Sequence, residues 1–243
     1  IWLAVVVVSS VSYASYLIQK FIFPDAGILI TSLLGGLYSS TATTVVLARK
    51  GREEPALNIS PAILLATTMM FVRLMLLAFF FNKEAGWALL PRMTALTVLS
   101  LIAAGILIQF GKAKGQLRGQ ASLTRNPLEF RSALIFAALF VFSVVATAYV
   151  TRVYGNKGFT IFSFLVGITD IDPFVITLLQ NVTMNPAFIA FAVLCATTGN
   201  NLLKMIYSLV LVGNRARIEL AISFSVLIAA GVIVAFFFWA PAG

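Results

Sequence analysis

The chain lacks histidine, has a single cysteine and carries few charged side chains. Of its 243 residues, only 10% are charged, whereas soluble domains contain about 25%. The lack of histidine excludes a His-based zinc site or proton relay, and Cys195 alone excludes an intrachain disulfide or a Cys-rich metal site. The sequence also contains no nucleophile elbow, P-loop or HExxH motif. We therefore expect a protein that is not an enzyme and that uses no cofactor.

Apolar residues are abundant instead, at 60% of the chain, and the mean hydropathy is +1.02. A soluble fold of this size could not bury so much apolar surface, so lipid must cover part of it. A membrane-spanning helix needs about 20 mostly apolar residues. Eight segments meet this requirement and predict an all-α polytopic membrane protein: residues 1–19, 27–48, 59–81, 87–110, 133–151, 158–180, 187–212 and 218–240.

Basic residues outnumber acidic residues by 17 to 8 and give the chain a net charge of +9. Most of them flank the apolar segments, and repeated basic-aromatic clusters are absent from the sequence. This distribution is typical of anchoring at the cytoplasmic face of a membrane, so the predicted partner is the lipid bilayer and not a nucleic acid. The chain starts at Ile1 within an apolar stretch that does not resemble a signal peptide, and we expect an N-terminal part to be missing.

The two halves of the chain resemble each other. A shift of 131 residues pairs Gly36 with Gly167 and Arg73 with Lys204. Glycines and mid-membrane cations that pair at one offset exceed what chance matching of apolar sequences gives, so we predict an internal duplication. The predicted parts are a first four-segment repeat at 1–110, a basic linker at 111–132 and a second four-segment repeat at 133–243.

Each repeat contains one interrupted apolar segment, 27–48 in the first and 158–180 in the second. If all eight segments cross the membrane, the repeats are parallel and the loop cations divide eight to six between the two sides. If the interrupted segments are re-entrant, the repeats are inverted. Eleven loop cations then share one side, and only Lys83, Arg152 and Lys157 oppose them. The second arrangement fits the positive-inside rule better, although both segments are long enough to cross as broken helices.

The interruptions consist of glycine followed by polar residues. In the first segment, Gly35 and Gly36 precede a run of hydroxyl side chains that includes Ser39, Ser40 and Thr41. In the second, Gly167 precedes two carboxylates and a proline, which has no N–H and disfavours helix at the residue before it. Interrupted segments at corresponding positions of two halves indicate a transport site. The predicted hinges are Gly35, Gly36, Gly167 and Pro173.

Four ionisable side chains lie within apolar segments, where insertion costs about 2.5–3.5 kcal/mol each. They are Arg73, Asp170, Asp172 and Lys204, and their formal charges sum to zero. The two aspartates either bind a cation or proton, or only neutralise Arg73 and Lys204.

Other polar side chains are candidates for the same site. Ser39, Ser40 and Thr41 either line it or serve packing. Asn201 shares a helix face with Lys204, while a packing role is equally expected for Asn200. Such oxygen ligands suit Mg²⁺ or Na⁺ more than a soft metal, and the sequence does not decide whether a metal binds.

Several motifs resemble a bacterial membrane domain of unknown function that is often fused behind an MgtC/SapB-type membrane domain. The motifs are Gly36 to Arg49, Gly167 to Asp172, Asn201 to Lys204 and the linker sequence Asn126 to Arg131. The resemblance extends from about Phe21 to past Arg217 and departs from the family pattern at Pro173, where a small residue is expected. It implies a multi-pass protein of the bacterial inner membrane. A preceding MgtC-type domain, or a second copy of the chain, is the partner it suggests.

The expected function is passage of a small ion, a cation or a proton-coupled solute, through a central polar site. Asp170 and Asp172 would bind the cation, Arg73 and Lys204 would hold the empty carboxylates, and one repeat would rock against the other. A static channel would use the same groups. The alternatives are a structural or regulatory subunit that binds a partner complex, and an anion transporter that uses Arg73 and Lys204.

Overall fold

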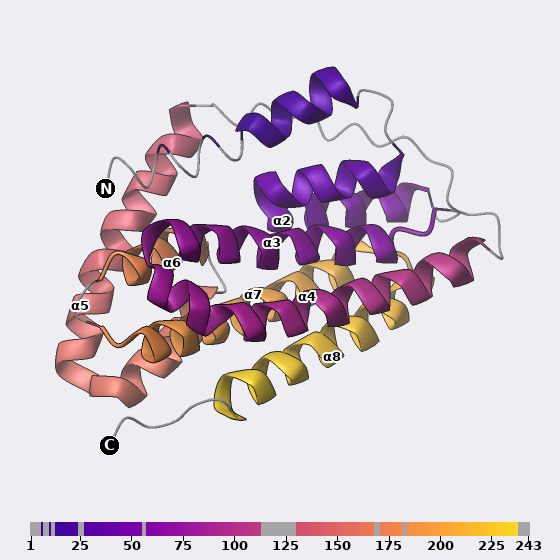
Figure 1. Cartoon of the computed structure of the whole chain (residues 1–243). Helices are drawn as coiled ribbons and strands as arrows, with labels where there is room; N and C mark the ends of the chain where they lie inside the picture. Colours follow the sequence, from indigo (N-terminus) through magenta and orange to yellow (C-terminus); the bar gives the residue numbers. More distant parts are fainter. Residues whose placement is uncertain are drawn as a thin grey trace. The chain divides into compact units, whose positions relative to one another are not determined.

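The computed structural model describes residues 6, 10, 13–23, 27–54, 57–112, 130–167, 171–181 and 184–237, without side chains at 111–112, 130–137, 139–140, 151, 156–157, 214–215 and 237. All regular elements in these residues are helices (Figure 1). They are the π-helix η1 (Ile18–Ile22) and the α-helices α2 (Ile28–Glu53), α3 (Ser60–Phe81), α4 (Lys83–Lys112), α5 (Phe130–Gly167), α6 (Ile171–Leu179), α7 (Pro186–Leu211) and α8 (Asn214–Phe237).

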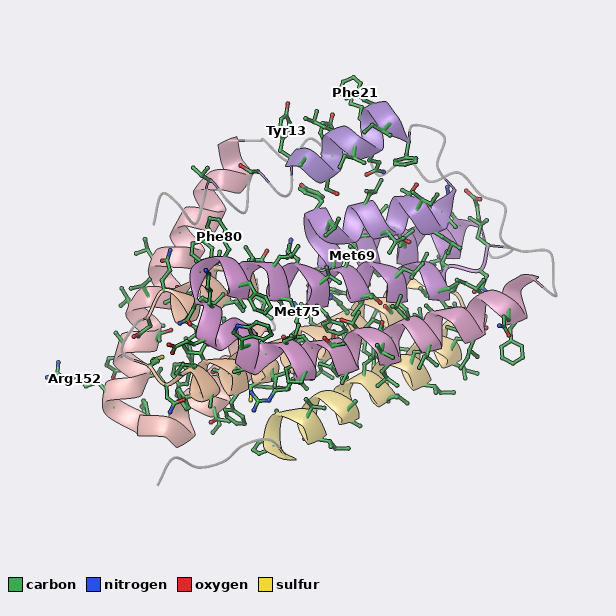
Figure 2. The ribbon with its side chains drawn as sticks, viewed as in Figure 1. Tyr13, Phe21, Met69, Met75, Phe80 and Arg152 are labelled. Atoms are coloured by element: carbon green, nitrogen blue, oxygen red, sulfur yellow. The ribbon has the colours of Figure 1, made fainter. Side chains whose placement is uncertain are left out.

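Within the residues that the structure describes, five helices are long and apolar enough to cross a membrane. They are Ile28–Glu53, Ser60–Phe81, Lys83–Phe110, Pro186–Leu211 and Ala216–Phe236. Large apolar side chains are also exposed, with Trp87 67% and Ile218 67% accessible. Figure 2 shows Tyr13 and Phe21 projecting outward from the segment that ends in η1. The chain is therefore an all-α, multi-pass membrane protein whose exposed apolar side chains face lipid.

Several predicted segments agree with single helices within a few residues, namely 59–81 with α3, 87–110 with α4, 187–212 with α7 and 218–240 with α8. The first predicted segment, 1–19, and the predicted linker, 111–132, lie largely outside the described residues. Helix α5 contains the predicted segment 133–151 and the first part of the predicted segment 158–180, and it is broken between them at Gly155. This glycine has φ 58° and ψ −155°, a conformation that a side chain would strain. The predicted joint is thus a glycine turn, and Arg152 next to it projects outward (Figure 2).

The second interrupted segment reverses direction between α5 and α6. Phe174 of α6 has its ring centroid 6.1 Å from that of Phe159 and 5.8 Å from that of Phe162, both in α5. In one straight helix, Phe159 and Phe174 would lie about 22 Å apart. The end of α5 and α6 therefore form a helical hairpin, as the re-entrant alternative for this segment requires.

The first interrupted segment, α2, is broken at Ser39. Its backbone there has φ −158° and ψ 102°, an extended conformation between two helical stretches. The predicted break in this apolar run is therefore present, and it lies at the first hydroxyl residue after Gly35 and Gly36. The two interruptions are the features around which the candidate site is built.

The chain forms two compact units, each assembled from both halves of the sequence. Unit 1 contains residues 1–73, 96–129 and 204–225, and unit 2 contains 74–95, 130–203 and 226–243. The boundary after Arg73 recurs 130 residues later, after Leu203, and the boundary after Ala95 recurs 130 residues later, after Ser225. The first interruption belongs to unit 1 and the second to unit 2.

Candidate functional site

In unit 1, Arg73 binds the carbonyl groups that the break in α2 leaves without helical partners. Its Nη1 donates to the carbonyl oxygens of Leu37 at 3.1 Å and Tyr38 at 3.0 Å. The Arg73 side chain comes from α3 and is 5% exposed. A cation at the carboxyl end of a helical stretch is also favoured by the helix dipole. Arg73 thus closes the first half of α2.

The other side of the same break is closed by Ser39. Its hydroxyl oxygen accepts a hydrogen bond of 3.3 Å from the backbone N–H of Ala42, three residues later. With its extended backbone, this makes Ser39 the N-cap of the second half of α2. The capping role accounts for a hydroxyl at this position and leaves its proton available as a donor.

The remaining hydroxyl residues of α2 differ in their environment. Ser40 is buried, Thr41 is half-buried, and Thr44 donates to the Ser40 carbonyl oxygen at 2.8 Å. Hydrogen bonds of this kind, to the residue four positions earlier, satisfy hydroxyls inside membrane helices. Thr44 is therefore explained by packing. Ser40 and Thr41, next to the cap, remain candidates for lining the break.

Gly36 allows α2 and α3 to touch backbone to backbone just before the break. A Cβ atom at Gly36 would lie 2.5 Å from the carbonyl oxygen and 2.6 Å from the Cα of Ala66. Gly35 is also buried. The predicted hinge Gly36 is thus packed against α3, where the reason for glycine is close approach of helices.

Lys204 is buried in unit 1 with 0% of its surface exposed. Its Nζ lies 3.1 Å from the sulfur of Met70, which comes one helical turn before Arg73 on α3. A thioether is a weak acceptor, so this contact alone does not account for a lysine at that depth. The predicted pairing of Lys204 and Arg73 with the aspartates stays a prediction, because Asp170 lies outside the described residues.

In unit 2, Asn200 takes the part that Arg73 takes in unit 1. Its Nδ2 donates to the carbonyl oxygen of Gly167, the last residue of α5, at 3.0 Å. Asn200 lies on α7 and is 1% exposed. A neutral amide, rather than a guanidinium, therefore binds the carbonyl end of the second interruption.

Helix α6 begins at Ile171, so Asp172 and Pro173 already belong to it. The sequence predicted that Pro173 would disfavour helix at Asp172. Helix α5 ends at Gly167 and α6 begins at Ile171, and Pro173 is compatible with α6 because a proline in the first turn of a helix needs no N–H partner. Asp172 is 6% exposed, and its position in the first turn suits a carboxylate electrostatically.

Two glycines bring α5 and α7 together at this point. A Cβ at Gly167 would overlap the backbone of Ala196, and one at Gly199 would overlap the carbonyl oxygen of Phe164. The helices therefore approach backbone to backbone along the turn of α7 that precedes Asn200. The predicted hinge Gly167 is a close-contact position, like Gly36 in unit 1.

Asn201 is also 1% exposed. Within the described part of the chain, the side-chain oxygens of Asn200 and Asn201 have no hydrogen-bond partner. The structure thus joins Arg73 with the break at Ser39, and Asn200 with the break after Gly167. The sequence had given Asn200 no preferred role. The sequence carries no clear signal for this role, because the residue at the matching position after the threonine pair of the first half is Met70.

These features define a multi-pass membrane protein with two interrupted helices whose freed carbonyl groups are bound by buried donors. The chain belongs to the family described as a domain of unknown function (DUF4010), which matches residues 6–213. It is also similar to an uncharacterized protein of Aquifex aeolicus (strain VF5), with 26% identity over 198 residues that cover 79% of this chain and 85% of the relative. No solved structure matches the chain. The resemblance to a domain of unknown function is confirmed.

Proposed function

We propose that the protein passes a small cation across the membrane, along the polar groups of its two interrupted segments. The observation that carries this proposal is the pair of breaks themselves, at Ser39 and between Gly167 and Ile171. Broken backbone at membrane depth is tolerated only where protein buries it or where it lines a water-filled path. Such breaks are typical of the substrate sites of transporters.

We also propose that the two halves are repeats of one ancestral unit. Gly36 contacts Ala66 in unit 1, and Gly167 contacts Ala196 in unit 2, so one glycine contact recurs in each half. The sequence Ala-Thr-Thr occurs at 66–68 and at 196–198, and all four threonines bond to the carbonyl four residues earlier. The matched unit boundaries support the same proposal.

An inverted arrangement follows if both interrupted segments are re-entrant. The second forms a hairpin. For the first, Gly36 and Gly51 are separated by 15 residues of α2, about 22 Å in a straight helix. Their neighbours Ala66 and Ile59 are only seven residues apart, about 10 Å along α3. A reversal at Ser39 accounts for this mismatch, and re-entrant segments place eleven of fourteen loop cations on one side.

The hydrogen bonds of the buried Arg73 favour a cation over an anion as the transported ion. Nη1 of Arg73 is committed to two backbone carbonyls, where it stabilises the break. Asp172 provides a buried carboxylate at the second break, and Asn201 provides a buried amide oxygen. In the proposed function, Asp170 and Asp172 bind the cation at the second break, and Ser40 and Thr41 line the first break, where Ser39 is the helix cap.

The setting of this function is proposed on the sequence resemblance. We place the protein in the bacterial inner membrane and propose that it works with a preceding MgtC-type domain or with further copies of itself. The competing proposal is a structural subunit in which the same buried groups only hold helices together. Transport measurements separate the two.

The test is uptake and efflux of Na⁺, K⁺, Mg²⁺ and H⁺ in liposomes that contain the full chain. The variant Asp170→Asn/Asp172→Asn removes both carboxylates and keeps their shape. We expect the parent to move one of these cations and the variant to lose at least about 90% of that flux, because a desolvated cation needs compensating charge.

The matched control is Glu219→Gln, which replaces a carboxylate of α8, outside both interrupted segments, that accepts a hydrogen bond from Ser60 at 2.6 Å. Its flux should equal that of the parent. If the parent moves no cation under any gradient, the subunit proposal replaces transport. If the double variant transports normally while folded, the aspartates are not the site.

A further inference from the structure

Two adjacent buried asparagine side chains in unit 2 each have an amide oxygen that accepts no hydrogen bond from the described part of the chain. Asn200 and Asn201 are both 1% exposed, and neither Oδ1 has a hydrogen-bond partner among the described residues. We infer that these oxygens, with the carboxylate of Asp172, bind one small monovalent cation of the Na⁺ class in a largely dehydrated state. This inference rests on the proposed function and names the kind of ion that it concerns.

The orientation of the Asn200 amide is fixed by its partner. The carbonyl oxygen of Gly167 can only accept a hydrogen bond, so the nitrogen of Asn200 must face it, as observed at 3.0 Å. The oxygen of the same amide therefore points away from Gly167 and cannot be exchanged with the nitrogen without losing this bond. Asn200 thus presents an acceptor at the end of α5.

A buried amide oxygen without a partner is uncommon and calls for an explanation, usually a water or an ion. Asn201 follows Asn200 on α7, and consecutive side chains leave a helix about 100° apart. Two such carboxamides can flank a single ion above the helix surface. Because both orphan atoms are acceptors, the missing partner is a cation or a hydrogen-bond donor and not an anion.

The charge comes from Asp172. Gly167 and Asp172 lie on the two sides of the same short break, and Asn200 is bonded to one of them. Asp172 is 6% exposed. A carboxylate and amide oxygens form a set of hard ligands that suits Na⁺ or Mg²⁺ and not a soft metal.

Burial decides between these two ions. Mg²⁺ loses water reluctantly and normally keeps several water ligands in protein sites. The carboxamides of Asn200 and Asn201 are almost fully buried, and Gly167 and Gly199 bring the backbones of α5 and α7 into direct contact beside them. A site so tightly enclosed suits an ion that binds with little of its water shell, so Na⁺ is the better fit.

The experiment measures Na⁺ binding without transport. The full chain, purified in detergent in N-methyl-D-glucamine chloride, is titrated with NaCl, KCl, NH₄Cl or MgCl₂ at constant ionic strength. The midpoint of thermal unfolding is measured, and ²²Na⁺ binding is measured by equilibrium dialysis. We expect Na⁺ to raise the midpoint in a saturable way, because a ligand that binds only the folded state stabilises it.

Asn201→Ala and Asn200→Ala should raise the half-saturating Na⁺ concentration by about tenfold or more, since even indirect partners of bound metals change affinity by about 10- to 100-fold. The control is Asn58→Ala, which removes an equivalent bond in unit 1, from Nδ2 of Asn58 to the Leu107 carbonyl at 3.1 Å. It should leave the Na⁺ response unchanged. If Asn200→Ala does not fold, Asn201→Ala decides, because it keeps the bond to Gly167.

The inference is overturned if all salts act alike, if only K⁺, NH₄⁺ or Mg²⁺ stabilises the parent, or if Asn201→Ala keeps the full Na⁺ response. Failure of this inference differs from failure of the proposed function. Specific Na⁺ binding without flux in liposomes contradicts transport alone. Flux of another cation with no Na⁺ binding contradicts this site alone.

Discussion

The two interrupted segments solve the same structural problem with different chemistry. In unit 1, a guanidinium from α3 binds the carbonyls of Leu37 and Tyr38. In unit 2, the neutral amide of Asn200 from α7 binds the carbonyl of Gly167. Both breaks follow a glycine that packs against the neighbouring helix. What differs is the charge brought to each break.

This difference has an electrostatic consequence. A guanidinium at the carboxyl end of the first half of α2 offsets both the helix dipole and the exposed carbonyls. A neutral amide satisfies only one carbonyl group with a hydrogen bond, and its own oxygen adds a further acceptor. The break in unit 2, with Asp172 in the first turn of α6, is therefore the more negative of the two. We assign a mainly structural role to the Arg73 break and ion binding to the Asn200 break.

Replacement of Arg73 tests this division most strongly. Arg73→Met keeps much of the apolar stem but leaves two buried carbonyls without their donor, at about 1–3 kcal/mol for each unsatisfied group. We expect a loss of folded protein in detergent or a large drop in the thermal unfolding midpoint. Fluorescence-detected size exclusion after heating measures both.

Two companion variants make the result specific. Arg73→Lys should recover part of the stability, because it retains a buried cationic donor without the planar fork. Arg92→Met removes an arginine whose Nη1 bonds to the Ala88 carbonyl of its own helix at 3.1 Å, and we expect little change. Equal effects of Arg73→Met and Arg92→Met would mean that the break needs no cation.

Much of this fold is readable from the sequence, because long apolar runs separated by charge, Pro or Gly have few interpretations in a membrane protein. The segments 59–81, 87–110 and 187–212 match α3, α4 and α7 within a few residues. The break at Ser39 was also foreseeable, since two glycines followed by hydroxyls weaken a membrane helix. The reversal between α5 and α6 was one of two open alternatives.

The roles of individual polar residues were harder to predict. Ser39 was predicted to line the site or to serve packing, and its capping role was not foreseen; the lining role stays a prediction. Pro173 was expected to break helix and instead lies in a first turn. Asn200 had no preferred role, because an amide is equally suited to packing and to binding. The role of Asn200 depends on a backbone carbonyl 33 residues away, and local sequence carries no such information.

The glycines of the two breaks provide the second test. Gly167→Ala places a Cβ into the backbone of Ala196, and Gly36→Ala places one 2.5 Å from the Ala66 carbonyl oxygen. Overpacking of this kind costs about 1–3 kcal/mol, so both should lower the unfolding midpoint. Gly105→Ala, with nothing within 4 Å of its Cβ, is the control and should be neutral or gain about 0.5–1 kcal/mol from helix propensity.

The relative destabilisation by Gly167→Ala and Gly36→Ala distinguishes the two breaks further. The overlap at Gly167 is closer than that at Gly36 and is backed by a second close contact at Gly199. We therefore expect Gly167→Ala to be the more destabilising substitution. If Gly36→Ala were the more destabilising substitution, the packing of α2 on α3 would be the tighter of the two contacts, and the expected order of the two contacts would have to be reversed.

The smallest expected effect concerns Ser39. Ser39→Ala removes the oxygen that accepts from the N–H of Ala42, and loss of an N-cap costs about 0.5–2 kcal/mol. Ser39→Asp should restore the stability, since aspartate caps as well as serine, and it introduces at the first break the residue type that position 170 has at the second. If the first break is only structural, Ser39→Ala lowers the unfolding midpoint without changing Na⁺ affinity or flux. A change in cation flux or selectivity with Ser39→Asp, at unchanged stability, would contradict a purely structural role of the first break.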